Sequence, residues 1–115
     1  MLPKINRLKK EKEFKKVYRF GRKAKFYYFI IRYNKNNLRE SRFGIVTPAS
    51  KVKKATQRNF IKRRITEIIR ANLNKIQKGY DIVILSIVKI EKNTPIDLEK
   101  EIINLFTKAE LIKRP

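Results

Sequence analysis

The sequence predicts an α+β fold, a two-layer sandwich of helices packed on a small sheet. Apolar residues recur at helical spacing over three segments and form short aromatic and β-branched runs over three others, in the order α-β-β-α-β-α. The strand, helix and strand in the middle require a parallel crossover. With 115 residues we expect a single domain spanning 1–115, in which only residues 1–6 are flexible.

Three segments carry helical periodicity. The first covers residues 9–20 and ends before Gly21, the second covers residues 55–76, and the third begins at residues 93–95. The apolar stripes that define the three helices are Phe14, Val17 and Tyr18; Ile61, Ile65, Ile68, Ile69 and Ile76; and Ile96, Leu98, Ile102, Ile103, Leu105 and Phe106.

Three shorter segments predict strands. Residues 25–33, KFYYFIIRY, are followed by the turn-forming residues 34–37, through which we expect them to pair with residues 42–47. Pro48 ends that second strand because proline cannot donate to the ladder. Residues 80–88, YDIVILSIV, are apolar enough to predict a strand in the middle of the sheet.

The charge of the chain indicates a polyanionic partner. There are 31 Lys and Arg against 10 Asp and Glu, and residues 1–64 alone hold 22 basic and 3 acidic side chains. Such an excess repels itself unless a polyanion neutralises it. We therefore expect nucleic acid bound by the first half. A membrane is not expected, because neither a long apolar span nor a suitable amphipathic helix stands out.

The chain lacks the side chains on which most protein-borne catalysis depends. It has no Cys and no His, which excludes the usual zinc sites, a thiolate nucleophile and an imidazole base. Its acidic residues are scattered, and there is no Gly-rich phosphate loop. We expect no catalytic residue and no cofactor bound by the protein. Because there are no disulfides and no secretory signal, we also expect a cytoplasmic location.

Basic side chains gather at the start of the long helix. Helical geometry turns Lys54 and Arg58 toward the isoleucine stripe with Lys62 beside them, while Arg63 lies near Asn59 on the opposite face. A guanidinium beside an amide suits contacts with phosphates and base edges. A solvated helix face would also explain these charges.

Aromatic and basic side chains alternate over residues 25–33. Unpaired bases stack on rings for about 1 to 3 kcal/mol each, while Lys and Arg hold the backbone. Core packing is the competing explanation for any single ring. Phe14 and Tyr18, one helical turn apart, leave the same two alternatives open.

Residues 53–70, KKATQRNFIKRRITEIIR, resemble the signature helix of the bacterial ribonuclease P protein subunit, in which an Ala precedes Arg-Asn-Arg, an apolar residue, Lys and Arg. Residues 7–21, 42–48 and 79–85 resemble the first helix, the Gly-containing strand and the last strand of that family, in the same order. The resemblance covers nearly the whole chain.

The resemblance implies a left-handed β-α-β crossover and a noncatalytic subunit of ribonuclease P. The RNA subunit would cleave with Mg²⁺, and the protein, monomeric apart from the complex, would bind that RNA and the 5′ leader of precursor tRNA. By position, the resemblance assigns RNA contacts to Arg58, Asn59, Lys62 and Arg63. We expect Lys51, Lys53 and Lys54 ahead of the helix to supply the charge of a Lys pair that is common in the family. The resemblance assigns the leader cleft to Phe14 and Tyr18, and we expect Tyr28 and Arg32 of the first strand to complete the cleft.

The chain departs from the family pattern at three places. Phe60 stands where the signature has its second Arg, so the ring packs or stacks instead. Pro48 to Lys51 replace a common Lys pair, and Arg32 stands where relatives can have an aromatic leader contact, with Tyr28 and Tyr33 as neighbours. Three other functions stay open: a structural ribosomal RNA-binding protein, a DNA-compacting protein and a metal-dependent nuclease that acts alone.

Overall fold

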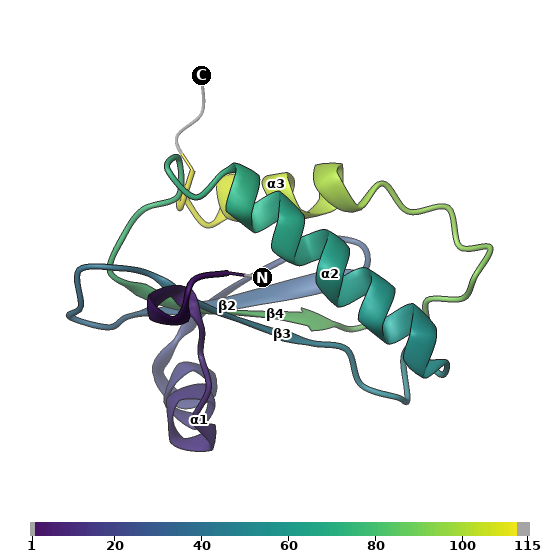
Figure 1. Ribbon diagram of the computed structural model, residues 1–115, viewed down its shortest axis with the longest axis horizontal. Coiled ribbons are helices and arrows are strands. Elements are labelled where there is room, and N and C mark those ends of the chain that lie inside the picture. Colours follow the sequence, from purple (N-terminus) through teal and green to yellow (C-terminus); the bar gives the residue numbers. More distant parts are fainter. Residues whose placement is uncertain (1, 113–115) are drawn as a thin grey trace.

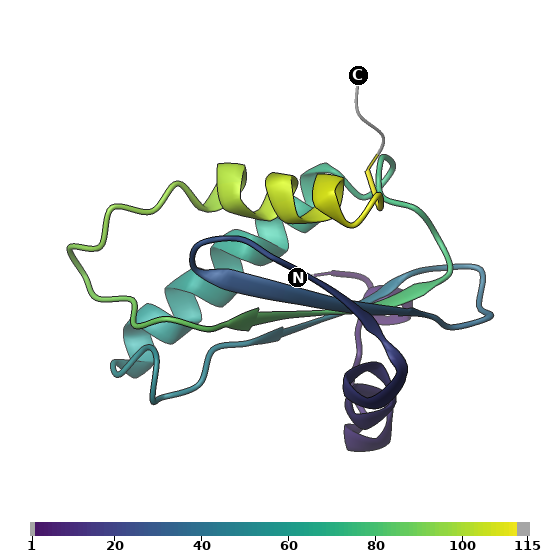
Figure 2. The ribbon, with the colours of Figure 1, turned by 180° about the vertical axis from the view of Figure 1, so that it is seen from behind.

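The computed structural model describes residues 2–112 and confirms the α+β class. Its four strands form one sheet in the order β1-β2-β4-β3, in which only the β3 and β4 pair is parallel. Helices α2 and α3 form a layer over one face, and α1 crosses the other face (Figures 1 and 2). The elements are η1 (Lys4–Asn6), α1 (Glu11–Phe20), β1 (Arg22–Lys25), β2 (Phe29–Lys35), β3 (Arg42–Val46), α2 (Ala55–Ala71), β4 (Tyr80–Ser86) and α3 (Leu98–Lys108).

Strand β4 lies inside the sheet, as its apolar sequence predicts. Ile82, Val83 and Ile84 are fully buried, which requires cover on both faces and a paired strand on each side. Strand β4 therefore separates β2 from β3. The expected direct pairing of residues 25–33 with 42–47 is wrong, because the burial of β4 outweighs the short connection between β2 and β3.

The predicted single strand over residues 25–33 is a tight hairpin. Strand β1 ends at Lys25, the Phe26 amide donates to the Phe29 carbonyl over 3.0 Å, and β2 returns antiparallel with Lys25 opposite Ile30. The reversal contains no Gly, Pro or Asn, so its aromatic sequence is that of a strand rather than a turn. The sheet therefore has one strand more than the sequence predicts.

Local side-chain hydrogen bonds move two predicted helix ends. Helix α2 ends at Ala71 rather than at residue 76, because the Asn72 side chain donates to the Ile68 carbonyl over 2.8 Å and the chain then turns. Helix α3 begins at Leu98 rather than at residues 93–95, because the Asp97 carboxylate caps it by accepting from the Lys100 amide over 3.1 Å.

The N-terminal segment packs beside the sheet from Leu2 onward, and Met1 lies outside the described residues. Leu2 is buried, and residues Lys4–Asn6 form a 3₁₀ turn. The buried Asn6 amide donates to the Ser41 carbonyl over 2.9 Å, which fixes the segment beside the sheet.

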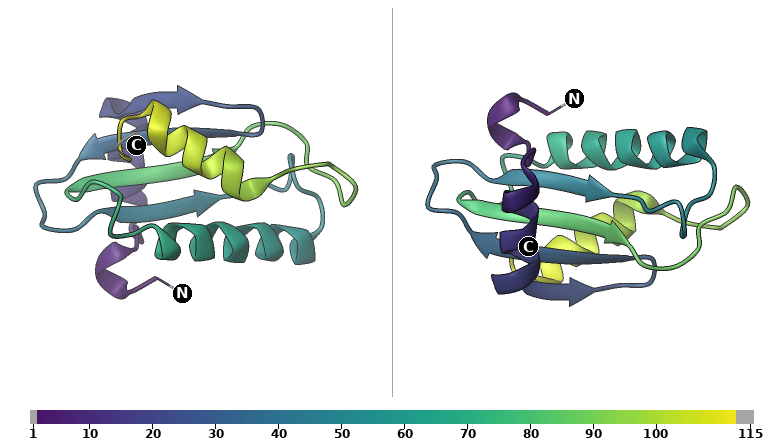
Figure 3. Two further views of the ribbon diagram at one scale, coloured as in Figure 1. Left: turned by 90° about the horizontal axis from the view of Figure 1, so that it is seen from above. Right: turned by 90° about the horizontal axis from the view of Figure 1, so that it is seen from below.

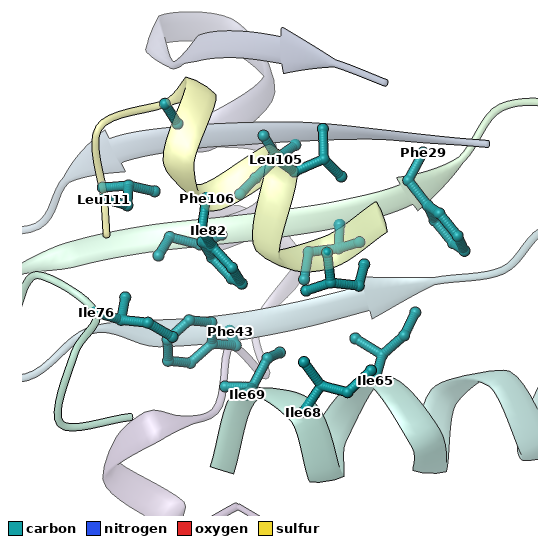
Figure 4. Packing of buried hydrophobic residues seen from close by; sticks show 14 of the residues in the cluster. Phe29, Phe43, Ile65, Ile68, Ile69, Ile76, Ile82, Leu105, Phe106 and Leu111 are labelled. Atoms are coloured by element: carbon teal, nitrogen blue, oxygen red, sulfur yellow. The ribbon is translucent and has the colours of Figure 1, made fainter. Parts of the chain in front are cut away.

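The main core lies between the sheet and the layer of α2 and α3 (Figure 4). Ile65 and Ile69 point from α2 toward the strands, which confirms the isoleucine stripe. Phe43 of β3 meets Phe106 of α3 edge to face, with ring centroids 6.3 Å apart. Within residues 2–112, no helix is both long and apolar enough to cross a membrane.

The connection from β3 through α2 to β4 is left-handed, as the family resemblance implies. When the left panel of Figure 3 is turned so that β3 and β4 point upward, α2 lies in front of the sheet and β4 lies to the left of β3. This hand is the rare one for parallel crossovers. It places α2 beyond the β3 edge, with its N-terminus close to the loop that follows β4 (Figure 3).

A buried carboxylate joins α3 to the β1–β2 hairpin. Glu101 is 4% exposed, and its Oε1 accepts from the Tyr28 amide over 3.3 Å. Its Oε2 has no hydrogen-bond partner among the described residues. Burial raises the pKa of Glu101 above its ordinary value, although the Tyr28 amide opposes the shift.

We expect Glu101→Gln to flatten the pH dependence of stability. The raised pKa means that the folded state binds this proton more tightly than the unfolded state, so the stabilisation is complete below the unfolded pKa and is lost as pH rises through the folded pKa. Urea unfolding of both proteins between acid and neutral pH measures the difference. Parallel stability curves for the two proteins would contradict the raised pKa.

Candidate nucleic-acid interface

Helix α1 is held on the sheet by a small second core. Leu8, Val17 and Val83 are buried together, and Phe14 and Tyr18 pack partly buried around them. Val83 alternates with Ile82 and Ile84 along β4, so its side chain faces α1 while theirs face the main core. Helix α1 therefore packs on the face of the sheet opposite the main core.

Phe14 lies directly on the backbone of β3. A Cβ atom added to Gly44 would stand 2.4 Å from Cε1 of the Phe14 ring, closer than any side chain tolerates. Only glycine allows this approach of helix and strand. The ring is half-buried, so part of it stays accessible at the α1 face.

Tyr18 and Arg32 pair one turn further along α1. The Arg32 Nη2 donates to the Tyr18 carbonyl over 2.5 Å, and the guanidinium carbon lies 5.6 Å from the centre of the Tyr18 ring. Burial raises the pKa of Tyr18, and the Arg32 charge opposes this shift. The structure thus brings Phe14, Tyr18 and Arg32 together on one face.

An ion-pair network fixes the N-terminal end of α1. Arg42 binds Asp81 through two hydrogen bonds of 2.8 and 2.7 Å and Glu13 through one of 2.5 Å. The other Glu13 oxygen accepts from the Lys9 and Lys10 amides, so the same carboxylate caps the helix. These amides, with Arg42, lower the pKa of Glu13 against the effect of burial. Sequence reasoning missed this network because its members are far apart in the chain.

Tyr28 lies apart from the group around Tyr18. Its ring packs against the main core, and its backbone is bonded to Glu101 of α3. The position of Tyr28 at the end of a hairpin, rather than inside a strand, accounts for this separation. Of the four residues predicted for a leader cleft, the structure brings Phe14, Tyr18 and Arg32 together.

Arg58 organises the segment that enters α2. Its Nη1 donates to the Val52 carbonyl over 2.9 Å and to the Lys53 carbonyl over 2.7 Å. The half-buried guanidinium therefore holds the preceding loop against the first turn of the helix. This structural work explains why Arg58 faces the packing side of α2.

The remaining signature residues lie on the open side of α2. Asn59, Lys62 and Arg63 are exposed, whereas Arg64 is half-buried and faces carboxylates of α2 and α3. Their exposure leaves the amide and the two cations accessible to a large partner.

Lysines from two distant segments meet beside the start of α2. A surface hollow is lined by the three lysines predicted ahead of the helix and by two from the loop after β4: Lys51, Lys53, Lys54, Lys89 and Lys92. The Ile90 amide donates to the Lys51 carbonyl over 2.8 Å, which ties the two segments together. Sequence reasoning missed Lys89 and Lys92, although the predicted parallel crossover was a signal for them. Parallel pairing of β3 with β4 brings the carboxyl ends of both strands, and the loops that follow them, to the same edge of the sheet.

Comparison with known proteins identifies the family. The family model described as Ribonuclease P matches residues 2–110. A ribonuclease P protein component from Fusobacterium nucleatum is 41% identical over 112 residues, covering 94% of this chain and all of that one. One from Thermotoga maritima is 35% identical, covering 90% and 92%. The chain belongs to the ribonuclease P protein family.

Solved ribonuclease P proteins have the same fold. A Thermotoga maritima structure superposes with a TM-score of 0.75 at 33% identity, covering 86% of this chain and 95% of that one. A Staphylococcus aureus structure reaches 0.84 at 22% identity, covering 94% and 98%, which shows the fold alone.

Membership in the family gives this chain its general function. It is the protein component of ribonuclease P, an endoribonuclease holoenzyme of tRNA 5′ processing, and it partners an RNA subunit. The ribosomal, DNA-compacting and stand-alone nuclease alternatives are thereby set aside. Within residues 2–112, no three His, Cys, Asp or Glu side chains converge where they could hold a metal ion.

We expect Gly44→Ala to destabilise this ribonuclease P protein by about 1 to 3 kcal/mol, because the added methyl group overlaps the Phe14 ring. Alanine in a strand is otherwise more stable than glycine, so a loss of stability would point to the overlap with the ring. Urea unfolding measures the cost. In a Phe14→Ala background the cost should fall, and an equal cost in both backgrounds would show that the ring is not the obstacle.

We expect Arg42→Met to cost about 3 to 5 kcal/mol, because Asp81, only 6% exposed, would lose its bidentate partner. Lys78→Met is the matched control, since Lys78 faces Glu40 at 3.6 Å on the surface and should cost at most about 1 kcal/mol. Chemical unfolding compares the two. Similar small costs would mean that the Arg42 network does not hold α1.

Proposed function

We propose that the protein binds two RNA segments within the ribonuclease P holoenzyme. The face of the sheet beneath α1 binds the single-stranded 5′ leader of precursor tRNA. Helix α2 and the basic segment ahead of it bind the catalytic RNA. The two surfaces lie on opposite sides of the sheet (Figure 1).

The grouping of Phe14, Tyr18 and Arg32 carries the proposal for the leader. The two rings are half-buried, whereas the core rings Phe29 and Phe106 are fully covered. A partly accessible ring beside a guanidinium suits an unpaired nucleotide, because the base stacks on the ring and the cation attracts the phosphate.

The exposed residues of α2 support binding of the catalytic RNA. Asn59 supplies donors and acceptors, and Lys62 and Arg63 supply charge on the same open surface. Arg58 contributes chiefly by holding the loop with Lys53 in place. Each phosphate neutralised releases counterions, so this contact should weaken as salt rises.

The cleavage chemistry belongs to the RNA subunit with its Mg²⁺. The chain has neither His nor Cys, and its surplus of cations suits neutralising and positioning the two RNA segments rather than proton transfer. We propose a cytoplasmic protein that is monomeric apart from its RNA complex.

We expect Phe14→Leu to weaken the affinity of the holoenzyme for precursor tRNA by roughly 5- to 150-fold, the value of one base-stacking contact. Leucine keeps apolar packing against Gly44 but removes the π-face. Single-turnover cleavage at low Mg²⁺, with assembled holoenzyme titrated over limiting precursor tRNA, measures the affinity. A substrate with a one-nucleotide leader should show no difference between wild type and variant.

The matched control acts on the other surface. Lys62→Gln combined with Arg63→Gln should weaken assembly with ribonuclease P RNA whether the leader is long or short. Loss of affinity from Phe14→Leu on both substrates alike would contradict the leader assignment. No stimulation of cleavage by the folded wild-type protein would overturn the proposed function.

A further inference from the structure

A groove separates the start of α2 from the loop that follows β4. Two adjoining hollows share Lys54, Gln57, Ile90, Glu91 and Lys92, so together they form one continuous depression. Both walls are braced: the Ile90 amide is bonded to the Lys51 carbonyl, and Ile90 itself is 4% exposed. The two segments that line the groove are therefore tied to each other and to the core.

The two hollows differ in chemistry. One is walled by the five lysines described above, and Glu91 is the single acidic residue that lines it. The other is largely apolar, with Ile61, Ile96 and Leu98 beside the ring of Phe60. A cationic compartment thus adjoins an apolar one with an aromatic wall.

Phe60 has no role in the core of the protein. It is 54% exposed on α2, next to Asn59 and one residue from the buried Ile61. Its ring does not pair with another aromatic ring within residues 2–112. An exposed ring at the rim of a lysine-walled groove indicates a ligand with both a flat apolar part and negative charge.

We propose that this groove binds one unpaired nucleotide of ribonuclease P RNA, with its base stacked on Phe60 and its phosphate among the lysines. The inference rests on the proposed binding of that RNA by α2. The catalytic RNA is the source, because the groove lies on the side of α2, whereas the surface proposed for the leader lies beneath α1 (Figure 1). An aliphatic peptide would use the apolar hollow but would leave five lysines unneutralised.

A single introduced indole tests the stacking directly. The chain contains no Trp, so Phe60→Trp places the only indole at the rim of the groove. We expect ribonuclease P RNA to quench its fluorescence and to shield it from acrylamide. Precursor tRNA alone should leave the signal unchanged. Binding of ribonuclease P RNA without quenching or shielding would overturn the proposal, as would quenching by precursor tRNA alone.

Affinity for ribonuclease P RNA separates stacking from apolar packing. Phe60→Leu should weaken binding by roughly 5- to 150-fold, and Phe60→Trp should retain it. Phe20→Leu is the matched control, because Phe20 is 63% exposed on α1, away from the groove. Thermal melts verify that each variant is folded. Wild-type affinity in folded Phe60→Leu would overturn the stacking contact.

The lysines are tested by salt dependence. Affinity for the RNA falls as salt rises. In the double variant Lys89→Gln with Lys92→Gln, the plot of log affinity against log salt should be less steep by about 0.7 to 0.9 for each phosphate that the variant no longer neutralises. An unchanged slope would exclude the phosphate from the groove. If wild-type protein neither binds nor stimulates the RNA, the proposed function itself fails; if it does both but the Phe60 and lysine variants match it, only this inference fails.

Discussion

Arg42 joins elements that are distant in the sequence but meet on the face of the sheet covered by α1. It extends from β3, binds Asp81 of β4 with two hydrogen bonds and binds Glu13 in the first turn of α1. Because Glu13 also caps that helix, the network fixes the point where α1 begins. Gly44, two residues along β3, then sets how closely α1 approaches. The positions of the accessible rings on this face depend on both constraints.

The two faces of the sheet are covered very differently. Helices α2 and α3 close one face with the main core, while α1 crosses the other over the small core around Val83. One short helix leaves part of a sheet face exposed to water, and an exposed face that is wholly apolar promotes aggregation. Arg32 on this face resolves the conflict, because its charge is tolerated where its guanidinium is bonded to the Tyr18 carbonyl. The same arrangement leaves cation and ring available to a ligand.

Sequence patterns specified the elements that depend on burial and missed the features that depend on topology. The isoleucine stripe of α2 and the interior place of β4 follow from apolar periodicity, and both are confirmed. The hairpin after Lys25 has no turn residue, so nothing local marks it. Lys89 follows the carboxyl end of β4, and parallel pairing with β3 brings that end to the start of α2, so only the topology, and no local pattern, places it. The hydrogen bond from Arg58 to the Val52 carbonyl could not be predicted from a local pattern either.

RNA binding is coupled to folding where the fold brings together lysines that are distant in the sequence. The cations of α1 are neighbours in the sequence and remain close in an unfolded chain. Lys51 and Lys89, by contrast, are 38 positions apart and meet only when β3, α2 and β4 are in place. A polyanion gains its contact with both lysines only when the chain is folded, so it stabilises the folded state to the extent that its affinity for that state exceeds its affinity for the unfolded chain. The repulsion that five clustered lysines impose on the free protein is thus relieved by the partner that recognises the cluster. The local cations of α1 attract RNA whether or not the chain is folded, so selection for the native conformation falls to the lysines assembled across the crossover.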